Sequence, residues 1–333
     1  MMSDFSQNEK YTTLMELRKH HVETDRDKQI LRHLNRLLMR DEHGNYLPRA
    51  RRFTGDLETR GITIIEAAGS GKTTAVNRVL SRHPALQVKQ GEDWPRYLRI
   101  QVPSPATLKS LGRAVLSATG LDRVAASTTA WEIWRIARHR LALLDIVVLW
   151  FDEAQDMFLS GSAREIDDML KMLKTLMQND SAVIPILSGT ERLAEITSYD
   201  PQVNRRFTKV VPAPLAPGLD DANLLHLIEA FTDEIGLRFE RDKLLAGRLI
   251  HASRCRFGRA VETILNAIEC AVEECAPNLT TMHFAEAWGM QEGCDWERNV
   301  FVSPNWASIE LDAGAAAFEA ARTARQNLQA GRK

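Results

Sequence analysis

The segment at residues 61–74 reads GITIIEAAGSGKTT, and most of the fold prediction starts from it. Its first five residues form a β-branched run that predicts a short buried strand. Gly69 and Gly71 follow, and glycine lets backbone N–H groups turn into a tight loop. Lys72 and Thr73 then open a helical pattern. A strand, a glycine-rich turn and a helix in this order indicate a phosphate-binding loop.

The loop supplies each group that binding of a nucleotide phosphate requires. Backbone N–H groups surround the phosphates, a lysine reaches the outer phosphates, and a hydroxyl binds magnesium. Glu66 departs from the pattern G-x-x-x-x-G-K-[ST], which has glycine there, so we expect altered loop geometry or slower hydrolysis. Taken alone, the segment also allows a Gly/Ser loop that binds no nucleotide. The predicted nucleotide-binding residues are Ala68, Gly69, Ser70, Gly71, Lys72, Thr73 and Thr74.

A second motif follows the most apolar stretch of the chain. Residues 146–151 read IVVLWF, which is typical of a strand covered on both faces. Asp152 and Glu153 come directly after it. We expect Asp152 to hold Mg²⁺ through water together with Thr73, and Glu153 to polarise the attacking water. The two motifs together predict ATP and Mg²⁺ as ligands.

Strand and helix patterns alternate through the first two thirds of the chain. Further strands are predicted at 97–102 and 182–187, and helices at 72–81, 106–118, 129–143 and 163–178. This alternation predicts an α/β fold with a parallel sheet. After three prolines at 212, 214 and 217, only helical patterns remain, at 220–235, 241–251, 258–274 and 280–289.

These patterns suggest four parts. They are a helical N-terminal extension over 1–60, including a helix at 27–39, an ATPase core over 61–217, a small all-helical lid over 218–290, and a tail over 291–333. The tail contains Trp296, Phe301 and Trp306, which either dock onto a partner or pack back on the lid. Its last part is either a helix or disordered. Trp131 and Trp134 lie one helical turn apart, and we expect both in the core rather than stacked on DNA.

The composition fits a protein without a membrane partner. The 333 residues carry a net charge of −1, but residues 61–144 hold twelve Lys/Arg against five Asp/Glu, a balance of +7. No apolar run approaches the roughly 18 residues of a membrane span, and no signal peptide is recognisable. The four cysteines form no Cys-x-x-Cys pair. We expect reduced thiols and a cytoplasmic location.

The order of these motifs resembles that of the AAA+ class of P-loop NTPases. The resemblance implies a five-stranded parallel sheet and a C-terminal helical lid. It also implies a polar sensor residue, for which Ser188 fits first and Thr190 second. An arginine that acts on a neighbouring subunit's nucleotide is expected at Arg205 or Arg206, unless both are ordinary surface residues. A lid arginine is expected at Arg259, with Arg256 a weaker candidate.

More narrowly, the chain resembles the TniB/TnsC-type ATPases of DNA transposition. The supporting stretches are VPSPAT at 102–107, DEAQ at 152–155, SGTER at 188–192 and DPQVNRRF at 200–207. The resemblance implies a homo-oligomer, ring or helical filament, that assembles with ATP on duplex DNA without sequence preference. It also implies a transposase and a target-selection protein as partners, with hydrolysis driving disassembly.

The family's DNA contacts tend to lie between the phosphate loop and the Asp-Glu strand, which is the basic segment here. Thr107, Lys109 and Arg113 on the predicted helix are the candidate DNA-binding residues, since backbone contacts use cations and hydroxyls. A plain solvated helix face is the alternative. Two other functions remain open: a nucleotide-bound switch with little turnover, and a helicase-loader or secretion-type AAA+ ATPase.

Overall fold

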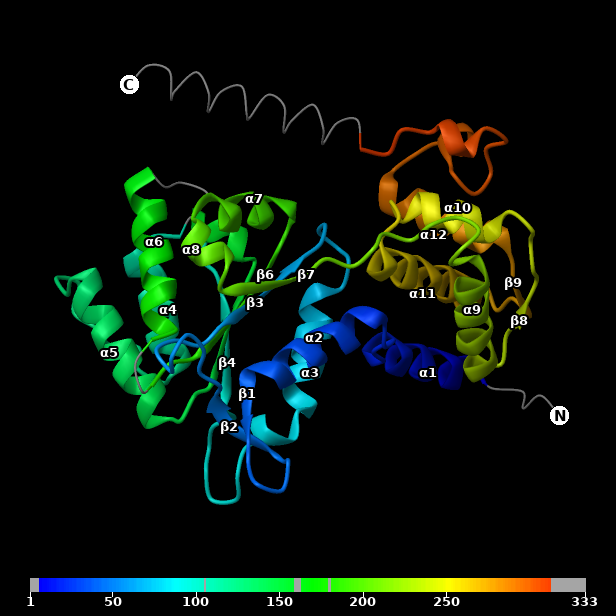
Figure 1. Cartoon of the computed structure of the whole chain (residues 1–333). Coiled ribbons are helices and arrows are strands. Elements are labelled where there is room, and N and C mark those ends of the chain that lie inside the picture. Colours follow the sequence, from blue (N-terminus) through cyan, green and yellow to red (C-terminus); the bar gives the residue numbers. More distant parts are fainter. Residues whose placement is uncertain (1–5, 105, 159–162, 179–180, 313–333) are drawn as a thin grey trace, which may run out of the picture. The chain divides into compact units, whose positions relative to one another are not determined.

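The computed structural model describes residues 6–104, 106–158, 163–178 and 181–312. The chain divides into two compact units (Figure 1). His21–Ala213 form the first, and Met1–His20 together with Pro214–Lys333 form the second. No helix among the described residues is long and apolar enough to cross a membrane.

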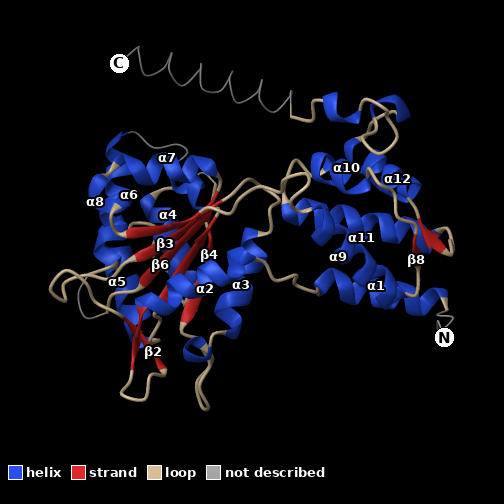
Figure 2. Ribbon diagram, turned by 45° about the vertical axis from the view of Figure 1, so that its right-hand side comes forward, coloured by secondary structure: helices blue, strands red, loops and turns tan. Residues whose placement is uncertain are grey.

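The first unit is built on a five-stranded sheet with all neighbouring strands parallel. The strand order is β4-β5-β6-β3-β7, and Figure 2 shows these strands between layers of helices. The sequence pattern predicted four of them, and the fifth, β7, completes the sheet that the AAA+ resemblance implied. The strands are β3 (Gly61–Ile65), β4 (Tyr97–Gln101), β5 (Val148–Asp152), β6 (Ile184–Gly189) and β7 (Phe207–Val210).

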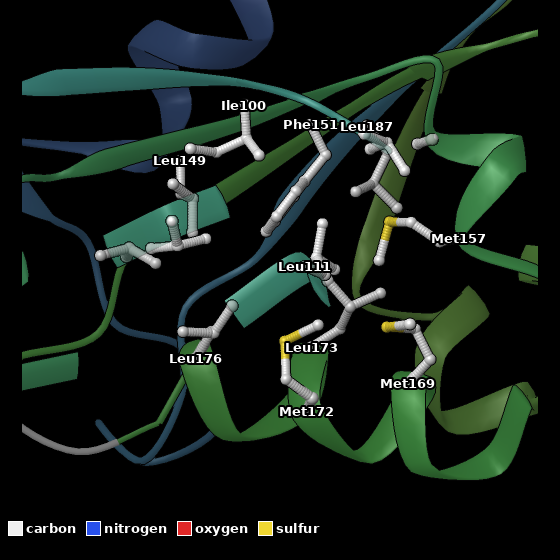
Figure 3. Packing of buried hydrophobic residues seen from close by; sticks show 14 of the residues in the cluster. Ile100, Leu111, Leu149, Phe151, Met157, Met169, Met172, Leu173, Leu176 and Leu187 are labelled. Carbon is white, nitrogen blue, oxygen red and sulfur yellow. The ribbon is translucent and has the colours of Figure 1, made fainter. Parts of the chain in front are cut away.

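Helices cover both faces of this sheet. One face packs against α2 (Asp25–Leu37) and α3 (Lys72–Arg82). The other packs against α4 (Leu108–Ala118), α5 (Ala130–Leu143) and α6 (Ala163–Leu176). Side chains alternate along a strand, so Trp150 joins the first cluster and Phe151 the second. Figure 3 shows Phe151 pointing from the sheet toward Leu111 and Leu173.

Both of these aromatic side chains are fully buried, which accounts for the uninterrupted apolar sequence of β5. Burying one such side chain stabilises the fold by about 2–3 kcal/mol. Two short helices, α7 (Glu191–Tyr199) and α8 (Pro201–Asn204), lie between β6 and β7. Two 3₁₀ turns, η1 (Pro84–Leu86) and η2 (Ala154–Phe158), complete the unit.

The sequence predicted a helical segment before the phosphate loop, but this segment also contains two strands. Helix α2 ends at Leu37, and an antiparallel hairpin of β1 (Leu38–Arg40) and β2 (Tyr46–Ala50) follows. The Asp41 carboxylate accepts hydrogen bonds from the backbone N–H of His43 at 2.9 Å and of Asn45 at 2.8 Å. This aspartate turn closes the hairpin.

The second unit is mainly helical. Besides its helices it contains one pair of two-residue strands, β8 (Arg238–Phe239) and β9 (Asn278–Leu279). Its helices are α1 (Gln7–Lys19), α9 (Asp221–Ile235), α10 (Leu245–Ala252), α11 (Phe257–Glu273) and α12 (Thr281–Glu292), followed by the 3₁₀ turns η3 (Trp296–Arg298) and η4 (Trp306–Ser308).

Helix α1 belongs to this second unit, although the sequence had assigned residues 1–60 to one extension. Leu14 and Leu17 of α1 are buried. Arg18 donates to the side chain of Asn266 on α11 at 2.9 Å and forms an ion pair with Glu269. Because of these contacts, the chain up to His20 belongs to the second unit, and the first unit begins at His21.

Residues 293–312 pack back on the helices of the second unit. Phe301 is 3% exposed and contacts Phe284 and Trp288, with ring centroids at 5.5 and 6.5 Å. Trp306 lies against the backbone of Gly247 and edge-on to His251. Trp296 is exposed, unlike these two. Residues 313–333 lie outside the described part of the chain.

Candidate nucleotide-binding site

The phosphate loop leaves the carboxyl end of β3 and runs directly into α3. Gly69 and Gly71 have φ values of 77° and 93°, a region that favours glycine. Gly71 is the N-cap of α3, so the free N–H groups of the first turn face the loop. A helix N-terminus of this kind binds anions through its N–H groups and its dipole.

Lys72 is held inside the loop. Its side chain is 4% exposed, and its Nζ donates to the carbonyl oxygens of Glu66 at 2.8 Å and Ala67 at 2.9 Å. Burial lowers the pKa of Lys72, and the carboxylates of Glu153, Glu66, Asp152 and Glu191 partly oppose that shift. The loop therefore holds a cation that can exchange carbonyl partners for phosphate oxygens.

Asp152 is the hydrogen-bonding centre of the site. It ends β5, and the sheet register sets it beside Ser188 on β6. The Thr73 hydroxyl donates to Asp152 Oδ2 at 2.9 Å, and the Ser188 hydroxyl donates to Oδ1 at 2.8 Å. Trp150 Nε1 donates in turn to Ser188 Oγ at 2.7 Å, which fixes the serine rotamer. The parallel sheet sets Asp152 beside Ser188, and the start of α3 adds Thr73, so three predicted site residues meet here.

These oxygen atoms fit a magnesium ion. Mg²⁺ takes oxygen ligands, usually one or two from the protein and the rest from phosphates and water. The Thr73 hydroxyl and the Asp152 carboxylate meet at the open end of the loop, next to Lys72. The buried Ser70 Oγ has no hydrogen-bond partner among the described residues, which leaves a donor for a phosphate oxygen.

The sequence reasoning did not single out Arg99 of β4. Its Nη2 donates to Asp152 Oδ2 at 2.8 Å, and its guanidinium lies over the ring of Trp150, 4.9 Å from the centroid. The pairing of Arg99 with Trp150 in the β4–β5 register explains this position. The sequence did contain one signal for Arg99, because a charged residue stood inside the predicted strand at 97–102.

Gln155 orients the predicted catalytic carboxylate. Glu153 has a positive φ of 56°, and its Oε2 accepts a hydrogen bond from Gln155 Nε2 at 2.8 Å. Gln155 Oε1 accepts in turn from the backbone N–H of Thr190 at 3.1 Å. A Cβ at Gly189 would lie 2.4 Å from Gln155 Oε1, so only glycine leaves room for this contact. Thr190 thus contributes a backbone N–H here, whereas Ser188 contacts Asp152 by its side chain.

Glu66 is part of a brace between α2 and the loop. Its Oε2 accepts a hydrogen bond from Arg26 Nη1 at 2.9 Å, and the same Nη1 donates to the carbonyl of Ser70, also at 2.9 Å. Arg26 is 5% exposed, and its Nε has no hydrogen-bond partner among the described residues. The glutamate that departs from the glycine pattern therefore ties the two ends of the loop to one arginine.

Arg205 and Arg206, the two candidates for an arginine finger that acts on a neighbouring subunit's nucleotide, differ completely in environment. The Arg206 side chain is 7% exposed, forms an ion pair with the buried Glu58, and donates to the Gln202 carbonyl at 2.6 Å. The Arg205 side chain is 61% exposed, with its nearest carboxylate oxygen, on Glu58, 3.8 Å away. The Arg206 side chain is thus engaged within the chain, and a catalytic role for either arginine stays a prediction. Of these two arginines, Arg205 is the one whose side chain is mostly exposed to solvent.

The family model described as "Bacterial TniB protein" matches residues 15–214, more than half of the chain. The chain belongs to the TniB family. No curated protein matches it in sequence.

Solved structures agree with this membership at the level of the fold. The TniB-family chain is similar to the Aeropyrum pernix ORC1 protein in complex with DNA, with a TM-score of 0.56 and 18% identity over 81% of this chain and 66% of that one. It is also similar to Cdc6p from Pyrobaculum aerophilum, with a TM-score of 0.53 and 11% identity over 81% and 71%. A third similar structure is the Aeropyrum pernix ORC2 protein in its ADPNP–ADP complexes. Its TM-score is 0.50, with 17% identity over 72% of this chain and 66% of that one. The fold is that of AAA+ P-loop ATPases.

Arg259 of the TniB-family chain lies at the start of α11 in the second unit. Burial lowers its pKa, and the cations of Arg254 and Arg256 lower it further. Its role at the nucleotide remains a prediction, as does that of Arg256, the N-cap of α11.

The candidate DNA-binding residues of the TniB-family chain make contacts within the chain. Thr107 is the N-cap of α4 and accepts a hydrogen bond from the backbone N–H of Ser110. Lys109 Nζ donates to the Ala126 carbonyl at 2.7 Å, and Arg113 Nη2 to the Ala125 carbonyl at 2.8 Å. Both long side chains thus hold the loop after α4, which was no part of the sequence prediction.

The two tryptophans of α5 in the TniB-family chain also separate. Trp134 is buried and donates from Nε1 to the Leu108 carbonyl at 2.8 Å, as expected of a core residue. Trp131 is 71% exposed, so its assignment to the core was wrong. The two residues are only one helical turn apart, but Trp131 lies in the first turn of α5, where its side chain stays exposed.

Proposed function

We propose that the chain is an ATP-hydrolysing AAA+ regulator of transposition. It assembles on duplex DNA with ATP, presents the site to a transposase, and comes apart on hydrolysis. The observation that supports this best is the convergence of Lys72, Thr73, Ser188 and Glu153 around Asp152, in a chain of the TniB family.

Each residue of the site has a proposed task. Backbone N–H groups from Ala68 to Thr74 and the Lys72 ammonium bind the phosphates. Thr73 and Asp152 would hold the magnesium ion of Mg·ATP, which supplies positive charge against the phosphate oxygens. Glu153, oriented by Gln155, positions and polarises the attacking water. Ser188 keeps the Asp152 carboxylate in place.

A neighbouring subunit would complete the site. Hydrolysis by P-loop NTPases is accelerated by an arginine that neutralises charge in the transition state. Arg205 is exposed on the turn before β7 and its partner Arg206 is buried, so only Arg205 can be offered outward. Such a head-to-tail contact generates rings or helical filaments.

Duplex DNA is the proposed activator. The segment 61–144 carries a balance of +7, which suits contacts with phosphates that do not depend on base sequence. The Aeropyrum pernix ORC1 protein, which shares the fold, was solved in complex with DNA. Thr107, Lys109 and Arg113 remain the proposed contacts, and the last two also hold the loop after α4 through the carbonyls of Ala126 and Ala125.

The test is ATP turnover with and without duplex DNA, with Lys72→Ala as the inactive control. We expect hydrolysis to rise with DNA, and electron microscopy with a non-hydrolysable ATP analogue to show rings or filaments on DNA. Turnover that DNA leaves unchanged, with no assembly on DNA, would remove the support for a transposition regulator.

A nucleotide-bound switch with little turnover is the second candidate. It is favoured by Arg99, whose guanidinium lies on the Asp152 oxygen that a magnesium ion needs. Tight ATP binding with turnover near background, both with and without DNA, would support the switch. Faster turnover in Arg99→Gln would identify Arg99 as the brake.

A further inference from the structure

A hollow of about 660 Å³ lies on the first unit and is lined by residues of helix α2 and of the β1–β2 hairpin. Figure 1 shows where these two elements lie. None of the residues predicted for the nucleotide or DNA sites lines it. We call it the α2–hairpin hollow.

The rim of this hollow is strongly basic. Residues 28–52 hold seven Lys/Arg against two Asp/Glu. The two acids are on the hairpin turn, where Asp41 caps backbone N–H groups and Glu42 lies 3.6 Å from His43. The cations that line the hollow are Lys28, Arg32, Arg36, Arg40 and Arg51.

Most of these cations have no carboxylate partner within the described residues. Lys28 has only a long exposed contact of 3.4 Å with Asp25, and Arg32, Arg36 and Arg51 form no ion pair there. The pKa of His33 is lowered by burial and further by the charges of Arg36 and Arg32, which indicates uncompensated positive potential. The guanidinium of Arg40 lies over the Tyr46 ring at 4.5 Å, so it is held in place.

The cations are also regularly spaced. Lys28, Arg32 and Arg36 follow each other at four-residue intervals along one side of α2, and four residues of helix rise about 6 Å. Carboxylates four residues apart on a partner helix have the same spacing.

The floor of the hollow is apolar and open. Leu31 and Met39 line it and are 40% and 41% exposed. An apolar centre with a charged rim is typical of protein–protein interfaces, where methionine and arginine are enriched. Methionine is also adaptable enough to receive more than one apolar side chain. DNA phosphates would use the arginines but leave this floor uncovered, because protein–DNA interfaces are more polar.

We propose that the α2–hairpin hollow is the docking site for an acidic segment of a partner protein that carries one or two apolar side chains. The apolar side chains cover Leu31 and Met39, and carboxylates on the same segment pair with the arginines of the rim, bidentately where geometry allows. This inference rests on the proposed function, because it names the kind of partner protein that an assembly regulator would recruit.

The test uses the full chain with fluorescein-labelled synthetic peptides and fluorescence anisotropy. The probe is a helical peptide of Glu, Ala and two Leu at four-residue spacing, and the comparison peptides replace both Leu by Ala or every Glu by Gln. The variants are Arg32→Glu/Arg36→Glu and Leu31→Asn/Met39→Asn. The charge-matched control is Arg238→Glu/Lys243→Glu, on exposed positions of the second unit.

We expect the acidic, leucine-containing peptide to bind the unaltered chain and the control equally. Both hollow variants should bind it at least about tenfold more weakly, and both comparison peptides should bind weakly to every form. Absence of binding, or binding that the hollow variants retain, overturns the proposal.

Labelled duplex DNA and ATP turnover are measured on the same variants. If Arg32→Glu/Arg36→Glu loses DNA binding while the peptide ignores the hollow, the surface binds nucleic acid and the proposal is wrong. Failure of DNA to stimulate turnover would instead count against the proposed function. The peptide result would still decide whether the α2–hairpin hollow is a docking site.

Discussion

At the scale of single residues, the site depends on side chains that hold other side chains. Gln155 is the clearest case, because its amide bridges Glu153 and the backbone N–H of Thr190. A general base has to be within hydrogen-bonding reach of its water, and small displacements of such groups are costly.

Replacing Gln155 by Ala should therefore lower kcat about tenfold or more and leave KM for ATP nearly unchanged. Steady-state hydrolysis measures both constants, and Gln155→Glu is the conservative comparison, since it keeps the size but not the donor amide. A kcat equal to that of the unaltered chain in Gln155→Ala would show that Glu153 needs no such support.

Arg205 and Arg206 are adjacent but should respond in opposite ways. Arg206→Ala leaves Glu58 buried without its partner and should lower the free energy of unfolding by about 3–5 kcal/mol. Arg205→Ala should leave the free energy of unfolding unchanged and abolish DNA-stimulated hydrolysis while sparing nucleotide binding. Denaturant unfolding and turnover assays separate these outcomes, and normal turnover in Arg205→Ala would exclude it as the finger.

The Arg26–Glu66 pair gives the third residue-scale prediction. Arg26→Met removes the donor to both Glu66 and Ser70, so the loop loses its brace and nucleotide affinity should fall about tenfold. Binding of a fluorescent ATP analogue measures the effect. The double variant Arg26→Met/Glu66→Gly, which restores the glycine of the usual pattern, should recover part of the loss, and equal affinity in all forms would contradict the brace.

At the scale of elements, the sequence predicted most of what carries the site. The strands β3, β4, β5 and β6 and the helix α3 all have strong local patterns, either apolar runs or a glycine loop followed by helical spacing. Parallel packing then fixes which carboxyl ends meet. For that reason Asp152 and Ser188 could be predicted as neighbours from the resemblance alone.

The elements that the sequence did not predict have weak or long-range signals. Strand β7 is four residues long and follows the charged turn at Arg205 and Arg206. The hairpin β1–β2 is short and partly exposed, so its residues lack an apolar pattern. Arg26 and Arg99 contact site residues that are 40 or more residues away in sequence, and only the fold brings such partners together.

The C-terminal segment offers a prediction at this scale. Phe301 is buried against α12, so Phe301→Ala should lower the free energy of unfolding of the second unit by about 3–5 kcal/mol. Trp296 is exposed, and Trp296→Ala should change that free energy by no more than about 0.5 kcal/mol. Thermal and denaturant unfolding test both, and an equal effect of the two substitutions would contradict the packing of this segment.

At the scale of the whole molecule, the proposed function requires one cation from a neighbouring subunit to complete the site. The phosphate loop, Asp152, Glu153 and Ser188 all belong to the first unit. Arg205 belongs to the same unit, and its side chain is 61% exposed, with only a long contact of 3.8 Å to Glu58. If a neighbouring subunit completes the site, only the oligomer hydrolyses ATP, so turnover per subunit should rise with protein concentration.

Mixing two inactive variants tests this claim most directly. Glu153→Gln lacks the catalytic carboxylate but keeps its arginine, and Arg205→Ala keeps the carboxylate but lacks the arginine. In an equal mixture on duplex DNA, each Arg205→Ala site that adjoins a Glu153→Gln subunit is complete, so hydrolysis should return to on the order of a quarter of the unaltered rate. A mixture no more active than either variant alone would contradict a site completed by a neighbouring subunit.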